Sequence, residues 1–183
     1  MKEQRRHQRI RFNTCPVVRL GQSGCAGTGT LENLSLGGLM VRTELPLRVG
    51  EIFGCEFRVI DSQLIDMAAT VVNQVGNCFG ARFQPGPISG WLIQDAIDQA
   101  LAQGAASMLS INDIQGRKVM RIAGGLNAGL RSDFMYNLTR IGVVEIDLSS
   151  VTNIDEAGLD LCHVAVEDYR IRVLPPPFGL RVT

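Results

Sequence analysis

Four arginines stand within seven residues near the start of the chain, at Arg5, Arg6, Arg9 and Arg11. They precede the first strand-like stretch, so a place in a hydrophobic core is excluded for them. A guanidinium can bind a phosphate through two parallel hydrogen bonds, and several on one arm can wrap a phosphodiester. The alternative is a solvated, charged terminus that only aids solubility.

A second polar group has the pattern N-x-S-x-x-G, formed by Asn33, Ser35 and Gly38, with a further glycine at Gly37. Asn33 and Ser35 are two residues apart, so on an extended backbone their side chains point the same way. An amide beside a hydroxyl can hydrogen-bond a phosphate or a base edge, and glycines let a ligand approach the backbone. The alternative interpretation is a polar turn that leads into a strand.

Taken together, R-x-x-x-R at residues 5–9 and N-x-S-x-x-G at residues 33–38 resemble the PilZ domain. The resemblance extends over about residues 5–104, and it includes a strand at residues 80–83 and a terminal helix. It implies a six-stranded antiparallel β-barrel that binds cyclic di-GMP. Arg5, Arg6 and Arg9 would then grip the phosphates and stack on guanine. The other side of the ligand would be held from the barrel by Asn33, Ser35, Gly37 and Gly38.

A third group lies at residues 143–158, where an apolar strand carries Asp147 and a helix start carries Asp155. This pattern is similar to the STAS domain, and the similarity covers about residues 110–175. The position of that family's phosphorylated hydroxyl holds Ala157, which excludes phosphorylation there. The family's last helix is expected to be missing after Leu174. The resemblance implies a scaffold that binds a protein partner. The position of Asp155 at a helix start favours a helix cap over a functional carboxylate.

No group of residues assembles a reaction centre, so the sequence predicts a protein that is not an enzyme. Cys162 and His163 are adjacent on a predicted helix and therefore point about 100° apart. The two histidines, His7 and His163, lack ligand spacing to any cysteine cluster, so we expect no metal site and no cofactor.

Composition bounds the class of protein further. The 183 residues carry 18 basic and 18 acidic side chains, and aromatic residues make up 5%. Zero net charge and few aromatics argue against a nucleic-acid binder. No apolar stretch is long enough for a membrane span, and no secretory signal is predicted. Five scattered cysteines indicate reduced, mostly buried thiols in a cytoplasmic protein. They are Cys15, Cys25, Cys55, Cys78 and Cys162.

The elements that must position these groups change character near residues 104–106. From residue 15 to 84 short alternating stretches predict strands, with Cys55, Phe57 and Val59 on one face. Gly76 marks a hairpin between the last two strands. A helix is predicted at residues 91–103, with Ser89 as its N-cap. We therefore expect a barrel domain at residues 1–104.

The second domain, residues 105–183, is predicted to be a small α/β unit, because strands alternate with helices. Strands are expected at residues 117–122, 143–148 and 170–174, and helices at residues 127–140 and 156–169. The last helix is predicted to turn five side chains inward. These are Leu159, Cys162, Ala165, Val166 and Tyr169.

The sequence thus predicts a cyclic di-GMP receptor whose STAS-like domain signals to a protein partner. One rival is a PilZ scaffold that binds no nucleotide and serves as an interaction module in a motility or envelope machine. Another is a single-stranded nucleic-acid binder that uses the arginines of residues 5–11, here called the arginine arm. The downstream partner, the number of bound nucleotides and the oligomeric state stay open, and an oligomer is compatible with the pattern.

Overall fold

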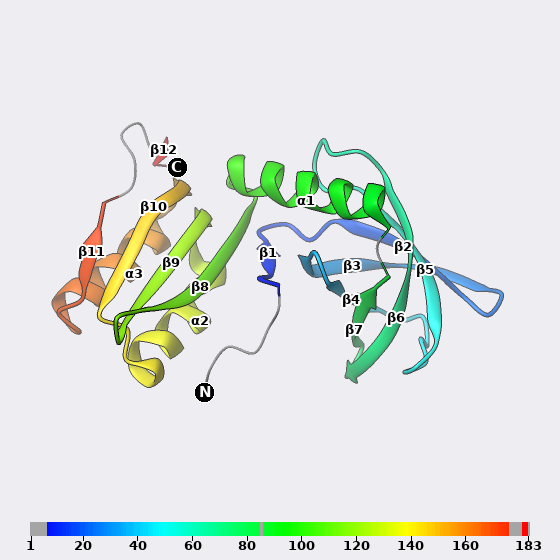
Figure 1. Cartoon of the computed structure of the whole chain (residues 1–183), viewed down its shortest axis with the longest axis horizontal. Coiled ribbons are helices and arrows are strands. Elements are labelled where there is room, and N and C mark those ends of the chain that lie inside the picture. The colour runs from blue at the N-terminus through cyan, green and yellow to red at the C-terminus, as the bar shows by residue number, and fades with distance from the viewer. Residues whose placement is uncertain (1–6, 85, 176–180, 183) are drawn as a thin grey trace. The chain divides into compact units, whose positions relative to one another are not determined.

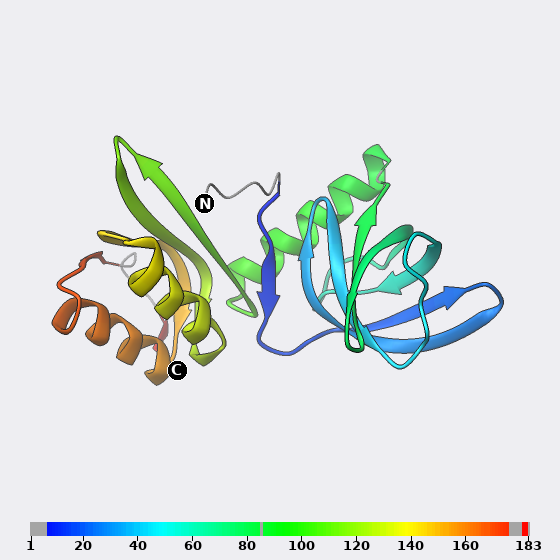
Figure 2. The same ribbon diagram turned by 90° about the horizontal axis from the view of Figure 1, so that it is seen from below.

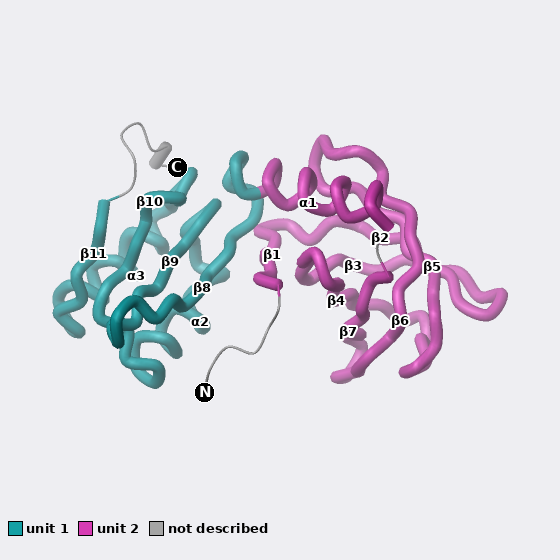
Figure 3. The backbone as a smooth tube through the Cα atoms, in the orientation of Figure 1, with its two compact units in different colours: residues 1–4, 101–183 teal, residues 5–100 magenta. Residues whose placement is uncertain are grey.

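The structure is a computed structural model of the chain, and it describes residues 7–84, 86–175 and 181–182. The chain forms two compact units, one of which ends at Ala100 while the other continues from Leu101 (Figure 3). Each unit has its own set of strands and its own buried residues, and each is described in turn.

The N-terminal unit is a closed barrel of six antiparallel strands (Figure 1). Around the barrel the strands follow the order β3, β2, β5, β6, β7 and β4, and β4 pairs again with β3. Their bounds are β2 (Val17–Gln22), β3 (Cys25–Ser35), β4 (Gly38–Thr43), β5 (Ile52–Phe57), β6 (Ile65–Val75) and β7 (Cys78–Phe83). Closure pairs every strand on both sides, which leaves no open edge.

Alternation along the strands fills the barrel, as predicted. Cys55, Phe57 and Val59 are all buried, whereas Glu56 faces outward and pairs with Arg19 at 2.8 Å. The predicted hairpin is confirmed, because Val75 pairs with Cys78 and Gly76 has φ +60°. A left-handed turn residue of this kind is favoured at glycine.

A seventh strand, β1 (Ile10–Phe12), lies outside this closed ring and pairs with the far end of β3. The long strand β3 therefore serves two neighbours on one side. Its residues 25–30 pair with β2, and its residues 33–34 pair with β1. Ile10 anchors the short strand, because its side chain is fully buried.

The helix after the barrel, α1 (Pro87–Ala102), begins four residues earlier than predicted. Proline has no amide hydrogen and a fixed φ, so it fits the first position of a helix. Ser89 is therefore inside the first turn rather than at the N-cap, and its hydroxyl donates to the carbonyl of Gly86 at 3.1 Å. Gly104 ends the helical segment with φ +68°, as expected for a C-terminal stop.

The C-terminal unit is a β-rich region with helices. Strands β8 (Ala106–Ile114) and β9 (Arg117–Leu126) form an antiparallel hairpin, while β10 (Glu145–Ile154) and β11 (Arg172–Leu174) extend the sheet in parallel. Strand β12 (Arg181–Val182) pairs with the end of β10. Between β9 and β10 lie the 3-10 helix η1 (Ala128–Leu130), α2 (Arg131–Tyr136) and the short π-helix η2 (Asn137–Ile141), and α3 (Glu156–Glu167) follows β10.

Several predicted elements of this unit have different bounds. Strand β8 was not predicted at all, the helix expected at residues 127–140 is broken into three pieces, and β10 continues through residues expected to form a loop. Register shifts after Asp147 and Val151 let β10 stay paired with β9 across that stretch. The predicted cap at Asp155 is confirmed, because its carboxylate accepts the amide of Gly158 at 2.8 Å.

The inward face of α3 also differs from the prediction. Its buried residues are Gly158, Leu161 and Ala165, whereas Leu159, Val166 and Tyr169 are exposed. A side chain at Gly158 would collide with the carbonyl of Leu126, so β9 approaches the helix backbone directly at this point. That close approach fixes the rotation of the helix about its own axis. Buried side chains of α2, α3, β9 and β10 form one core. The ribbons of α2 and α3 lie on the same side of the sheet (Figure 2).

Candidate functional site

The turn between β3 and β4 is held in place by contacts with three strands, β3, β4 and β7. Ser35 pairs with Gly38 across the turn, and its buried hydroxyl donates to the carbonyl of Gly38 at 3.1 Å. The carbonyl of Gly37 in turn accepts the amide of Phe83, at the end of β7, at 3.1 Å. The polar motif of residues 33–38 therefore forms a turn whose backbone is fixed on both sides.

Gly38 is required by the packing of β4 on β7. A Cβ atom at this position would collide with the backbone carbonyl of Ala81 and would lie 3.2 Å from the Cα of Arg82. Backbone atoms of a paired strand cannot move aside, so only glycine fits. In the ladder between β4 and β7, Arg82 is the residue directly opposite Gly38.

The arginine arm reaches this turn through β1. Ile10 pairs with Leu34, and Arg11 pairs with Asn33. Continuing the register by one residue puts Arg9, whose side chain is exposed, opposite Ser35. The structure therefore brings one arginine of the first motif beside the polar residues of the second. Arg5 and Arg6 lie outside the described residues.

His7 makes a direct contact with the turn. A Cβ atom at Gly37 would lie 2.8 Å from Cδ2 of His7 and 3.7 Å from its Cγ and Nε2. The imidazole therefore covers the face of the glycine.

Asn33 carries an unsatisfied acceptor. Its Oδ1 atom is buried and accepts no hydrogen bond from any described residue. A buried polar atom without a partner costs on the order of 1–3 kcal/mol, so such atoms are rare unless a ligand or another group completes them. The atom marks the point where this site can receive a hydrogen-bond donor.

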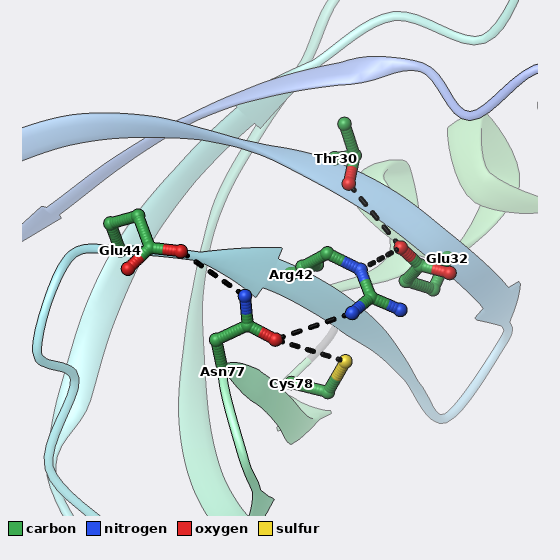
Figure 4. A network of polar contacts seen from close by, with 6 residues as sticks. All are labelled: Thr30, Glu32, Arg42, Glu44, Asn77 and Cys78. Carbon is green, nitrogen blue, oxygen red and sulfur yellow. Dashed lines mark hydrogen bonds and ion pairs between the residues drawn. The ribbon is translucent and has the colours of Figure 1, made fainter.

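Two arginines of the barrel, Arg42 and Arg82, differ in whether their side chains have hydrogen-bond partners. Arg42 is held by Glu32 at 2.8 Å and by the side-chain oxygen of Asn77 at 3.2 Å, and Asn77 donates to Glu44 at 3.1 Å (Figure 4). Arg82 makes no hydrogen bond or ion pair with a described residue, and its side chain is exposed. Arg82 is therefore available to an anion next to the turn, whereas Arg42 already has its partners.

The structure thus places five of the predicted residues in one region, namely Arg9, Asn33, Ser35, Gly37 and Gly38. Two further residues, His7 and Arg82, were missed as site residues. Arg82 had a visible signal, since it is the outward-pointing position of the strand at residues 80–83 that the resemblance includes. His7 had none, because its contact depends on the register of β1.

Within the described parts of the chain, the cysteines, histidines and acidic residues form no second candidate site. Cys55 alone is fully buried and Cys25 is exposed, so the expectation of mostly buried cysteines is wrong. Burial raises the pKa of Cys162 to about 11, which disfavours a thiolate beside His163. No three His, Cys, Asp or Glu residues gather there as metal ligands. None of the helices in those parts has the length and apolarity that a membrane crossing requires.

The fold and this region together define a small β-barrel with an arginine arm and a polar turn. The family model described as the PilZ domain matches residues 3–102, just over half of the chain. The chain belongs to the PilZ domain family. No curated protein matches the chain.

Among solved structures, the chain is similar to the PilZ domain with c-di-GMP of YcgR from Escherichia coli. The identity is 18%, the match covers 53% of this chain and 91% of that chain, and the TM-score is 0.46. It is also similar to the inhibitor of motility MotI/DgrA of Bacillus subtilis, at 18% identity, 54% and 52% coverage and a TM-score of 0.44. The PlzA protein of Borreliella burgdorferi, in complex with c-di-GMP, matches at 18% identity, 52% and 41% coverage and a TM-score of 0.40.

Proposed function

We propose that the barrel is a receptor for cyclic di-GMP, which binds where the arginine arm meets the turn of residues 33–38. The observation that carries this proposal is the pairing of β1 with β3, with Ile10 opposite Leu34 and Arg11 opposite Asn33. This register brings the cationic motif beside the polar motif, although they are more than twenty residues apart in the sequence. Each motif alone would fit a solvated tail or an ordinary turn.

The residues of the region suit a nucleotide dianion with exposed purine faces. Arg9 and Arg82 supply guanidiniums that can pair with phosphate or stack on a base. Arg5 and Arg6, by their place in the motif, would add to this grip. The free Oδ1 of Asn33 suits an N–H donor on a guanine edge. Ser35, Gly37 and Gly38 would hold the turn in the shape that the ligand meets.

Isothermal titration of the full chain with cyclic di-GMP tests the proposal and also gives the number of nucleotides bound. We expect saturable binding, with GTP and cyclic AMP as controls that bind far more weakly. An absence of heat at millimolar ligand would favour the rival interpretation, a PilZ scaffold that binds no nucleotide. Competition with a single-stranded oligonucleotide tests the other rival, since a shared site would let the oligonucleotide displace cyclic di-GMP.

We also propose that the C-terminal unit is a STAS-like module that binds a protein partner. Two features support this proposal, and the first is the strand order β8, β9, β10, β11 with helices following β9 and β10. The second is the surface of α3, where Leu159 and Val166 are exposed beside the acidic residues Glu156, Asp160 and Glu167. An apolar strip with an acidic border suits a partner helix with a basic border.

Substitution of the strip tests this second proposal. Leu159→Ser with Val166→Ser should leave the fold intact, because both side chains are exposed. The double variant should lose a partner that wild-type protein captures and whose binding weakens with salt. Unchanged capture of every salt-sensitive partner by the variant would contradict a role for α3.

A further inference from the structure

We propose that Gly37 is a seat for the imidazole of His7, and that this contact positions the arginine arm for nucleotide binding. The inference rests on the proposed function and adds a positioning residue to it. Its basis is the placement of the ring, whose Cδ2 lies 2.8 Å from where a Cβ of residue 37 would stand. Two carbon atoms in ordinary contact are about 3.5–4.0 Å apart, so the ring occupies space that any side chain at Gly37 would need.

The backbone of Gly37 does not by itself demand glycine. Seven glycines of the described chain have positive φ values, and Gly37 is not among them. Its neighbour Gly38 is fixed by the Ala81 carbonyl, which is backbone, whereas the atoms that face Gly37 belong to the end of a side chain. Room for the ring of His7 is therefore the structural reason for glycine at residue 37.

The contact gives the arm an anchor in addition to the strand β1. The strand is three residues long, and Ile10 is its fully buried side chain. Arg9 lies between two fixed points, the buried Ile10 on one side and the seated His7 on the other. Two anchors so close in the chain restrict the direction of the Arg9 side chain, which reduces the ordering that the ligand must impose.

A double-mutant cycle tests the proposal. Gly37→Ala adds a methyl group that must displace the ring, and His7→Ala removes the ring and leaves the glycine. We expect each change to weaken cyclic di-GMP binding about tenfold, as estimated for an arm that must be ordered on binding. The double variant should bind no more weakly than either single variant, because the same contact is lost only once.

Two measurements control for folding. Gly54→Ala in β5 is the matched control, because the nearest atom to its added Cβ is the carbonyl oxygen of Gly21 at 3.9 Å. It should bind like wild type, and all variants should unfold within about 3 °C of wild type. The chain has two histidines, so His7→Ala identifies the ring signal of His7 by nuclear magnetic resonance. That signal should shift in ligand-free Gly37→Ala.

The outcomes separate this inference from the proposed function. If wild-type protein binds no cyclic di-GMP, both are overturned. If it binds and either single variant binds equally well, the seat is overturned while the receptor function stands. If the losses of binding free energy of the two single variants add up in the double variant, the seat is overturned as well. Additive losses would mean that Gly37 serves the ligand directly. An unshifted His7 signal in Gly37→Ala would show that the ring is not on the glycine.

Discussion

The backbone carbonyl of Ala81 lies where the side chain of residue 38 would begin, so Gly38 is locked against β7. Substituting Gly38 with alanine forces β4 and β7 apart next to the candidate site. We expect Gly38→Ala to lower the free energy of unfolding by about 1–3 kcal/mol, in the range of overpacked positions. Urea denaturation measures this, and Gly54→Ala is the control. A variant as stable as wild type would contradict the close approach of the two strands.

The arginine arm should supply much of the binding free energy. Each charge-assisted hydrogen bond contributes about 1.5–3 kcal/mol, so Arg5→Ala with Arg9→Ala should cost about 3–6 kcal/mol. This corresponds to binding of cyclic di-GMP weakened roughly a hundredfold to ten-thousandfold. Arg19→Ala, on the exposed Arg19–Glu56 pair of the barrel, is the control and should bind normally. Equal affinity of the double variant and wild type would remove the arm from the site.

Substitution of Asn33 should weaken ligand binding without lowering the stability of the fold appreciably. Its buried Oδ1 has no described partner, so truncation to alanine removes a desolvated atom without breaking a side-chain hydrogen bond of that oxygen. We expect Asn33→Ala to leave the free energy of unfolding within about 1 kcal/mol of wild type, or to raise it. Binding of cyclic di-GMP should weaken by about 1–3 kcal/mol. A destabilised variant with intact binding would assign Asn33 a structural role.

Asp147 makes the stability of the C-terminal unit depend on pH. Hydrogen bonds from Ser149, followed by those from Arg121, hold the pKa of this carboxyl below its usual value, although burial acts the other way. A depressed pKa in the folded state contributes stability above the unfolded pKa of about 3.9, and this contribution is lost as the pH falls through the folded value. Thermal unfolding of Asp147→Asn should show a loss of about 1–2 kcal/mol at pH 7.

Below about pH 4 the difference between wild type and Asp147→Asn should narrow, because protonation removes the same interactions from wild type. Glu51→Gln is the control, since the Arg48–Glu51 pair is exposed and its nitrogen and oxygen atoms are 3.6 Å apart. A difference that stays constant from pH 7 to pH 3 would show that the charge of Asp147 contributes no stability.

Thiol labelling should distinguish the cysteines. Burial raises the pKa of Cys55 to about 12, whereas Cys25 is exposed at the start of β3. At pH 8 a thiol reagent should modify Cys25 first and should reach Cys55 only when the barrel unfolds. Mass spectrometry of the labelled peptides measures both rates. Rapid labelling of Cys55 in native protein would mean that the barrel opens at β5.

The features that depend on local pattern could be predicted from the amino-acid sequence. Alternation gave the barrel strands and the inward face of β5, and Gly76 gave the hairpin between β6 and β7. Asp155 indicated a helix start, because its carboxylate can accept the backbone amide of the residue three positions later, here Gly158. Strand β8 is not predicted by the sequence. In the structure it joins β9 through a tight hairpin, in which Gln115 and Gly116 both have positive φ.

Which residues from distant parts of the chain come into contact depends on the packing of the whole fold. The inward face of α3 follows from the approach of the Leu126 carbonyl to Gly158, and an amphipathic pattern with apolar residues on two sides cannot reveal it. The candidate site depends likewise on the register of β1 along β3. A shift of one residue would move His7 from Gly37 and separate Arg9 from Ser35, and that register is set by the burial of Ile10 beside Leu34 rather than by any local preference of the arm.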